Sequence, residues 1–201
     1  VPVRLFHRSL QPHLSADFTE AEAAFGHDIA EKWSKDGCGI ASATIAVDSL
    51  RGVANEDVAL PSVTALCQEF RETAYLAGIG WLHQGLVDFA KHYGMGAFNH
   101  GNESYESMCS YLLEGWLAIP SVPLYFRGGE QVGTADGTTR TLGKGGHLVV
   151  VSGFKIKAGK LTGFFVDDCQ NRQLRDGDES EEFVQLSKFQ SSFSGKVIYI
   201  K

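Results

Sequence analysis

The sequence contains little of what marks metal-binding or disulfide-rich proteins. Its 201 residues include four cysteines, no two of them form a C-x-x-C pair, and no histidine stands at zinc-ligand spacing from any of them. No metal site is therefore predicted. A chain of this length can bury a large core without disulfides. A disulfide framework is not expected, although a single bridge such as Cys67 to Cys109 stays open.

Long apolar runs are also absent. No run reaches the roughly 18 residues that a membrane helix needs, and the opening residues 1–7 are not followed by the apolar segment of a signal peptide. We therefore expect no membrane partner. Because the chain begins with Val1 rather than methionine, a cytoplasmic protein and one secreted after removal of a signal peptide both stay open.

Basic residues are outnumbered by acidic ones. There are 18 Lys and Arg against 24 Asp and Glu, for a formal net charge of -6. Nucleic acid and anionic lipid both bind basic surfaces, so neither is an expected partner. With 43% hydrophobic and 21% charged residues, the composition is that of a globular protein, and the length suits a single domain over residues 1–201. The pattern predicts no oligomeric state.

The first part of the chain has helical periodicity interrupted by glycines. The first helix has Asp17 or Thr19 as its cap, and a turn is expected at 34–37. Small side chains fill the helix that starts at Cys38 and stops near Gly52, so we expect it to lie buried at the centre. Helices are predicted over residues 20–25 (extended or restarted over 28–33), 38–50, from Pro61 onwards, 81–93 and 103–113.

From residue 117 onwards the period changes to two. Pro120 and Pro123 disturb the first of these segments, so we expect it to be an edge strand or a bulged one. Strands are predicted over 117–126, 147–152, 161–166 and 196–200, with 153–160 as a hairpin connection. Helices first and antiparallel strands second indicate an α+β fold.

A glycine-rich segment, residues 127–146, leads directly into His147. Loops longer than about 12–15 residues are usually functional or disordered. Its stretch 137–144 has neither the spacing nor the Ser or Thr after the lysine that a nucleotide-binding P-loop needs. No cofactor is predicted from it.

Cys38 is a candidate nucleophile. A thiol attacks a carbonyl as thiolate, and a helix N-terminus with a neighbouring imidazolium can lower its pKa from about 8.5 by several units. Cys38 follows Gly37 and opens an alanine-rich helix, so the positive end of the helix dipole points at the sulfur. The alternative interpretation is an inert buried cysteine.

His147 and Asp168 are candidate partners of that thiol. His147 follows Gly145 and Gly146 at the start of a strand, and Asp168 ends the next one. If the two strands pair across their hairpin, both residues lie at the same end and the carboxylate can orient the imidazole. A histidine capping a strand and an ordinary turn are the alternatives.

The segment Cys38-Gly39-Ile40-Ala41-Ser42-Ala43 resembles the Cys-Gly-Pro-Ala signature of the bacteriocin-processing (double-glycine) peptidases, family thirty-nine of the papain-like cysteine peptidases, and their stand-alone relatives. Further segments are similar to that family in the same order, and the resemblance covers roughly residues 30–200. These segments are residues 80–95, 112–120, 146–154, 165–169 and 193–200.

The resemblance implies a papain-like fold and a cysteine peptidase that hydrolyses peptide or protein substrates through a thioester acyl-enzyme, without a cofactor. By position, Cys38 is the nucleophile, His147 the general base and Asp168 the orienting carboxylate. Cys169 replaces the family's proline, which could bring its sulfur close to Cys38.

One departure weakens the expectation of activity. Lys32 stands where the family has the glutamine of the oxyanion hole, and losing one oxyanion donor costs about 10²–10³ in rate. The backbone N–H of Cys38, with Ser34 or Lys32, could serve as donors instead. A catalytically weak or inactive peptide-binding module and another acyl transferase, such as a transglutaminase, are therefore alternatives.

Overall fold

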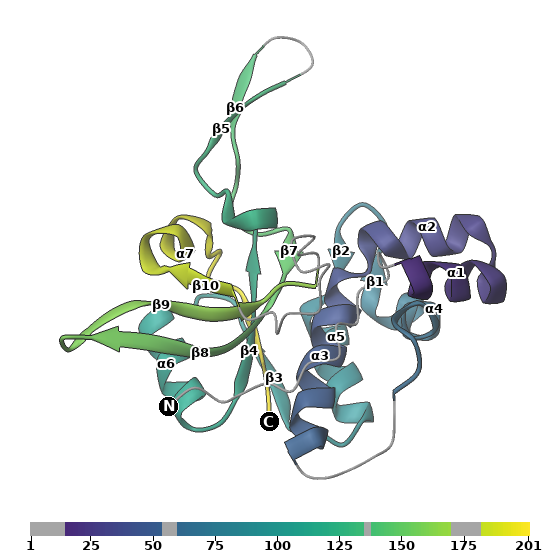
Figure 1. Cartoon of the computed structure of the whole chain (residues 1–201), viewed down its shortest axis with the longest axis horizontal. Helices are drawn as coiled ribbons and strands as arrows, with labels where there is room; N and C mark the ends of the chain where they lie inside the picture. The colour runs from purple at the N-terminus through teal and green to yellow at the C-terminus, as the bar shows by residue number, and fades with distance from the viewer. Residues whose placement is uncertain (1–14, 54–59, 135–137, 170–181) are drawn as a thin grey trace.

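The computed structural model of the chain describes residues 15–53, 60–134, 138–169 and 182–201. Helices α1 to α5 stand beside a sheet that carries α6 and α7 on its other side (Figure 1). None of these helices is long and apolar enough to cross a membrane. The helices are α1 (Ser15–Phe25), α2 (His27–Asp36), α3 (Cys38–Val53), α4 (Val63–Ala74), α5 (His83–His92), α6 (Tyr105–Leu113) and α7 (Leu186–Ser192), with a 3-10 turn, η1, at Leu124–Phe126.

The main sheet is antiparallel and has the order β10-β9-β8-β4-β11-β3, with the short β7 also paired to β4. Its strands are β3 (Ala97–His100), β4 (Leu117–Val122), β7 (His147–Leu148), β8 (Val150–Lys157), β9 (Lys160–Asp167), β10 (Glu182–Gln185) and β11 (Val197–Ile200). Two hairpins stand apart from it. They are β1 (Tyr75–Leu76) with β2 (Gly80–Trp81), and β5 (Gln131–Gly133) with β6 (Thr139–Thr141).

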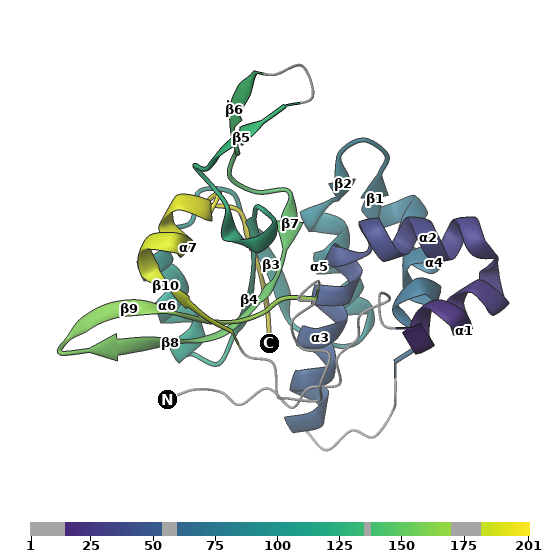
Figure 2. The same cartoon turned by 45° about the horizontal axis from the view of Figure 1, so that its top comes forward.

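The second hairpin lies within the glycine-rich segment and projects away from the rest of the molecule in both views (Figures 1 and 2). Its base is closed by backbone hydrogen bonds between Gly129 and Leu142 and between Leu142 and Glu130. The remaining residues of the segment carry the chain back to β7.

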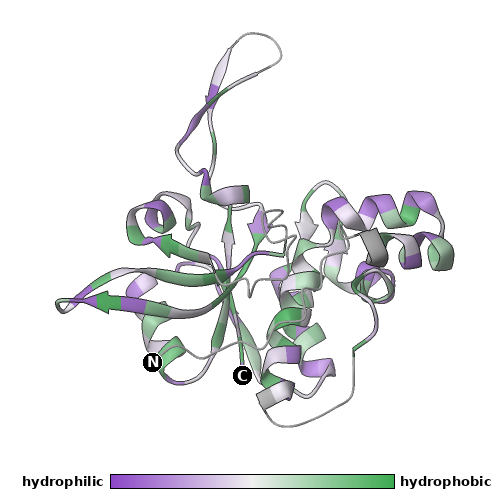
Figure 3. Cartoon of the chain, viewed as in Figure 1, coloured by the Kyte–Doolittle hydropathy of each residue, from purple (hydrophilic) through white to green (hydrophobic). Residues whose placement is uncertain are grey.

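Hydrophobic side chains cover both faces of the sheet. Leu117 and Ile119 of β4 pack with α3 and α5, whereas Ala118 and Val122 pack with α6 and α7. Apolar colour accordingly runs through α3 and the central strands, while α2 is largely hydrophilic (Figure 3). All six residues of β4 are therefore buried.

Helix α3 lies at the centre of the molecule, as predicted. It contacts α4, α5 and strands β4, β7 and β8. Ala43 and Ala46 are fully buried, and the Ser42 hydroxyl donates a hydrogen bond to the Leu148 carbonyl oxygen at 2.8 Å. Small side chains allow this close approach and so fix the first turn of α3 against β7.

Strand β4 differs from the prediction, because it lies inside the sheet between β8 and β11 rather than at an edge. Ser121 pairs with Leu148, and Ala118 pairs with Val151. That register places Pro120 opposite Val149, where β7 and β8 are separated. Proline has no N–H to donate. Because the neighbouring strand is interrupted at this point, no hydrogen bond from residue 120 is needed there.

Several element boundaries and connections also differ. The predicted turn at 34–37 begins as the last turn of α2, Gly52 lies within α3, and Asp17 and Thr19 lie inside α1 rather than capping it. The sequence analysis missed β3, β10 and α7, which are short and interrupted by polar residues. All four cysteines are free, so the possible Cys67–Cys109 bridge is not formed.

Candidate active site

Glycines on both sides of Cys38 set its position as the first residue of α3. A side chain on Gly37 would place its Cβ 2.5 Å from the Trp33 carbonyl oxygen, and one on Gly39 would place it 2.4 Å from the Trp81 ring. The chain can therefore end α2 and start α3 within one residue, tightly against Trp81. Cys38 stays partly exposed at this junction.

The backbone conformation of the two preceding glycines positions His147. Gly145 and Gly146 have φ values of 94° and 103°, which side-chain-bearing residues rarely adopt. The Gly146 N–H donates to the Ser121 hydroxyl oxygen at 3.3 Å, and a Cβ on Gly145 would lie 3.0 Å from that same oxygen. Gly145 thus lets the loop before His147 pack closely against Ser121.

Asp168 immediately follows β9. The last residue of that strand, Asp167, pairs with Val150 of β8, so Asp168 reaches the start of the β7–β8 segment. Its Oδ1 lies 2.7 Å from His147 Nε2, and the two residues are 7% and 4% exposed. The predicted pairing thus brings the carboxylate to the imidazole and away from water.

The surroundings of His147 favour its charged form. Burial on its own would lower its pKa, but hydrogen bonds with Asp168 and Cys38, together with the charges of both groups, raise the pKa from 6.5 to about 9. Because Nε2 faces Asp168, Nδ1 is the nitrogen left to face the sulfur. At neutral pH the ring is therefore a cation beside Asp168 and the Cys38 sulfur.

A cleft of about 830 Å³ opens beside Cys38. On the helical side it is lined by the β1–β2 hairpin and the start of α5, and on the other side by the ends of β3, β4, β7 and β11. Ser121, Gly146 and Lys196 line it from the sheet. An extended chain can therefore lie across the thiol between the two parts.

The residues expected to replace the oxyanion glutamine do not reach this cleft. Lys32 is exposed, and its Nζ lies 4.5 Å from the centre of the Trp33 ring. The Ser34 hydroxyl donates to the Glu31 carbonyl oxygen at 2.7 Å. Neither side chain lines the cleft. At the start of α3, the backbone N–H of Cys38 remains the donor that the sequence analysis named.

Cys169 lies behind the cleft. Its Sγ is 3.7 Å from the Cys38 carbonyl oxygen and 3.9 Å from the Ser42 hydroxyl, so it contacts the backbone of Cys38, and both cysteines are free. Burial raises its pKa well above the ordinary value, so it is a neutral thiol that packs against the first turn of α3. Its sulfur and the ligand atoms of His147 and Asp168 lie within 4.8 Å of one another, a donor set that could hold a metal ion.

Sequence reasoning missed Trp81 and Ser121 as parts of this site. Trp81 fills the space that Gly39 leaves open and donates its indole N–H to the Asp36 carbonyl oxygen. Ser121 holds the loop before His147. The glycines at 39 and 145 were the only visible signs of these contacts, because a glycine shows that something lies close without showing what.

No family model matches the sequence, and no curated protein does. Among solved structures, a protein described as a C39-like peptidase from Bacillus anthracis aligns with a TM-score of 0.50 at 14% identity, covering 83% of this chain and 88% of that one. The peptidase domain of Streptococcus ComA, a bifunctional ABC transporter of a quorum-sensing pathway, has a TM-score of 0.49 at 16% identity, with 83% and 91% covered.

A double-glycine-motif protease from an AMS/PCAT transporter, solved in complex with a leader peptide, aligns with a TM-score of 0.48 at 14% identity, covering 81% of this chain and 83% of that one. At such identities the likeness to the Bacillus protein shows the fold. The predicted α+β, papain-like fold is therefore confirmed.

Proposed function

We propose that the chain is a cysteine peptidase in which Cys38 is the nucleophile, His147 the proton carrier and Asp168 the group that orients His147. The observation that carries this proposal is the buried 2.7 Å hydrogen bond between His147 Nε2 and Asp168 Oδ1, with the other side of the ring turned to Cys38 at the start of a helix. A structural histidine has no need of a thiol on one nitrogen and a carboxylate on the other.

The chemistry follows from this arrangement. The Cys38 sulfur attacks the carbonyl carbon of the peptide bond, and the oxyanion that forms accepts a hydrogen bond from the Cys38 backbone N–H. His147 gives its proton to the leaving amine, the C–N bond breaks, and a thioester remains. Water then loses a proton to His147 and attacks the thioester, which releases the carboxylate product and the thiolate.

A second candidate function is a peptide-binding module with little or no catalysis. It is favoured by the position of Lys32 and Ser34, which leave the oxyanion without the side-chain donor that a glutamine would supply. The cleft beside Cys38 would hold the peptide in either case. Transglutamination differs only in that an amine attacks the thioester, and no feature of the site favours an amine over water.

The proposal is tested with Cys38→Ala and, as a matched control, Cys109→Ala. Cys109 is half-buried on α6, where burial and Glu106 raise its pKa to about 11. Each protein is incubated with a mixture of peptides derived from digested cell extract, and new termini are identified by mass spectrometry. We expect cleavage by the wild type and by Cys109→Ala, and none by Cys38→Ala.

Iodoacetamide labelling near pH 6.5 provides an independent reading of the same site. Cys38 should be carboxamidomethylated first, ahead of the half-buried Cys109 and of the buried Cys67 and Cys169. Unchanged cleavage in the Cys38→Ala variant would show that this residue is not the nucleophile. If peptides bind to the wild type and none is cut, the binding module is the function.

A further inference from the structure

Lys196 places a cation in the cleft that the proposed peptide chemistry does not use. It lines the same cleft as Cys38, and its side chain is exposed. Among the residues that the structure describes, no carboxylate forms an ion pair with it. In a chain with a net charge of -6, an unpaired lysine inside a cleft is a feature to explain.

The backbone holds Lys196 at a defined distance from the proposed triad. Its carbonyl oxygen accepts a hydrogen bond from the Ser121 N–H at 2.9 Å, and Ser121 pairs with Leu148, next to His147. Neighbouring strands lie about 4.8 Å apart, so two strand spacings put the Lys196 backbone about 10 Å from that of β7. An extended peptide spans that distance in about three residues.

The other charged groups that line the cleft are already paired. Lys35 Nζ lies 2.6 Å from Glu31 Oε1. The Asp36 carboxylate accepts a hydrogen bond from the Tyr75 hydroxyl at 2.9 Å. These contacts leave Lys196 as the cation available to a ligand in this part of the cleft.

His83, the first residue of α5, lies on the opposite wall of the cleft from β11. Both residues line the same cleft, and burial, followed by the charge of Lys196, lowers the pKa of His83. A neutral imidazole donates one hydrogen bond without repelling the lysine. The Asn99 amide of β3, which donates to the Gln84 side-chain oxygen at 3.1 Å, also lines the cleft.

We propose that Lys196, assisted by His83, binds a carboxylate of the substrate peptide within about three residues of the bond that Cys38 attacks. The inference rests on the proposed peptidase function and adds a substrate class to it. The carboxylate belongs either to an acidic side chain or to the peptide's own C-terminus, since both present the same anion to the lysine.

Binding is measured on the Cys38→Ala background, so that no turnover is required. Pools of acetylated octapeptide amides carry Glu or Gln at one fixed position and random residues elsewhere, and the fixed position is moved along the peptide. We expect one position at which the Glu pool binds about two- to fivefold more tightly than the Gln pool, as for a partly exposed ion pair. Pools with a free C-terminus distinguish a terminal carboxylate from a side chain.

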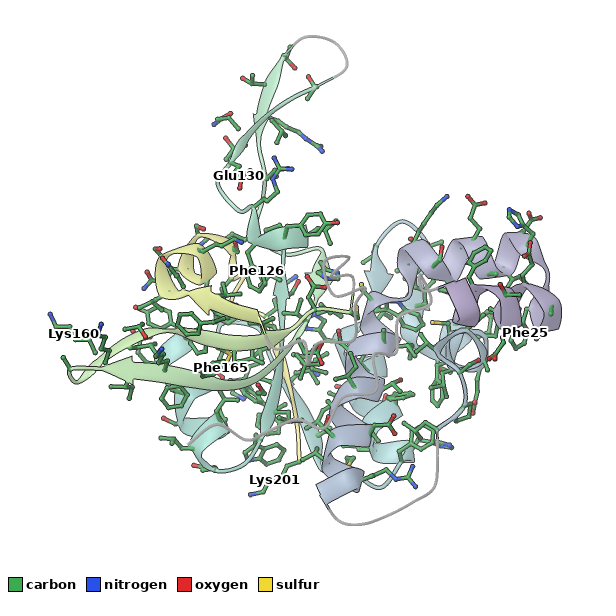
Figure 4. All side chains as sticks on the ribbon, viewed as in Figure 1. Phe25, Phe126, Glu130, Lys160, Phe165 and Lys201 are labelled. Atoms are coloured by element: carbon green, nitrogen blue, oxygen red, sulfur yellow. The ribbon has the colours of Figure 1, made fainter. Side chains whose placement is uncertain are left out.

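The preference for Glu should disappear in Lys196→Gln and persist in Lys196→Arg. The matched control is Lys160→Gln, because Lys160 is an exposed lysine at the end of the β8–β9 hairpin (Figure 4) and does not line the cleft. An equal preference in wild type and Lys196→Gln, or no carboxylate preference at any position, would overturn the proposal.

Alkylation of Cys38 in the otherwise unmodified protein provides a reading that needs neither a peptide nor catalysis. The ratio of the rates with iodoacetate, an anion, and iodoacetamide, which is neutral, should fall about twofold in Lys196→Gln at low salt. This ratio should stay unchanged in Lys160→Gln.

If carboxylate selection is present and no peptide is ever cleaved, the peptidase proposal fails and the carboxylate site stands. If cleavage occurs without carboxylate selection, the carboxylate site fails and the peptidase proposal stands.

Discussion

At the scale of single residues, the fold changes the chemistry of His147. In water its ring would be largely neutral at pH 7. In the protein, the buried hydrogen bond to Asp168 and the contact with Cys38 raise its pKa to about 9. The folded state therefore holds an imidazolium next to a sulfur, the pairing that activates a cysteine nucleophile.

We expect peptide cleavage by the wild type to decline on the alkaline side with a midpoint near pH 9, because the pKa of His147 is raised from 6.5 to about 9. The imidazolium is present below that pH and is lost above it. Protonated His147 also stabilises the folded state. Its contribution to the free energy of unfolding is complete below pH 6.5 and disappears as the pH rises through 9. A profile of kcat/KM against pH measures the midpoint.

Two substitutions of Asp168 distinguish the effect of its negative charge from its role in orienting the His147 ring. Asp168→Asn keeps an oxygen that can accept from Nε2 but removes the charge, so the alkaline midpoint should move to lower pH with a moderate loss of kcat. Asp168→Ala should also lose the orientation of the ring and most of kcat. An unchanged midpoint in Asp168→Asn would contradict the role assigned to this carboxylate.

At the scale of elements, the start of α3 depends on the β1–β2 hairpin. Trp81, at the end of β2, packs where a side chain on Gly39 would be. The Tyr75 hydroxyl in β1 bonds the Asp36 carboxylate at the end of α2. The hairpin thereby holds the junction between α2 and α3, where Cys38 lies, and forms one wall of the cleft.

Gly39→Ala should destabilise the protein by about 1–3 kcal/mol, as an overpacked core does, because its Cβ would lie 2.4 Å from the Trp81 ring. Gly52→Ala is the matched control. That position is in the same helix with nothing within 4 Å of the added Cβ, so it should gain about 0.5–1 kcal/mol. Urea unfolding measures both, and equal effects would rule out the proposed packing.

Most elements were predictable because their signals are local. The small residues of α3 and the period-two runs of β8 and β9 each mark their own segment. The place of β4 within the sheet was not predictable, since it depends on how Pro120 meets the break at Val149. The path of β3 and β10 depends in the same way on partners distant in the sequence.

At the scale of the whole molecule, the sheet joins two hydrophobic clusters. One lies between the sheet and helices α3 to α5, and the other between the sheet and helices α6 and α7. Strands β4 and β11 contribute side chains to both. The cleft forms at the boundary between the helical part and the sheet, so the site exists only when both are folded. That residues 1–201 form one domain stays a prediction.

That prediction implies one cooperative unfolding transition. Far-UV circular dichroism reports the helices and strands together. In Trp116→Phe, the fluorescence comes from Trp33 and Trp81, which lie in the cluster of α3 to α5. We expect both signals to change at the same urea concentration. Two separate midpoints would indicate that the helical part and the sheet unfold independently.

The sequence by itself determined the α+β class, the central helix at Cys38 and the three candidate residues of the site, because composition, periodicity and glycine positions are properties of short segments. Only the tertiary structure decided that His147 Nε2 meets Asp168, that Lys32 lies outside the cleft and that Lys196 lies inside it. Those facts depend on strand order and on side chains that meet from distant segments, and no local pattern carries that information.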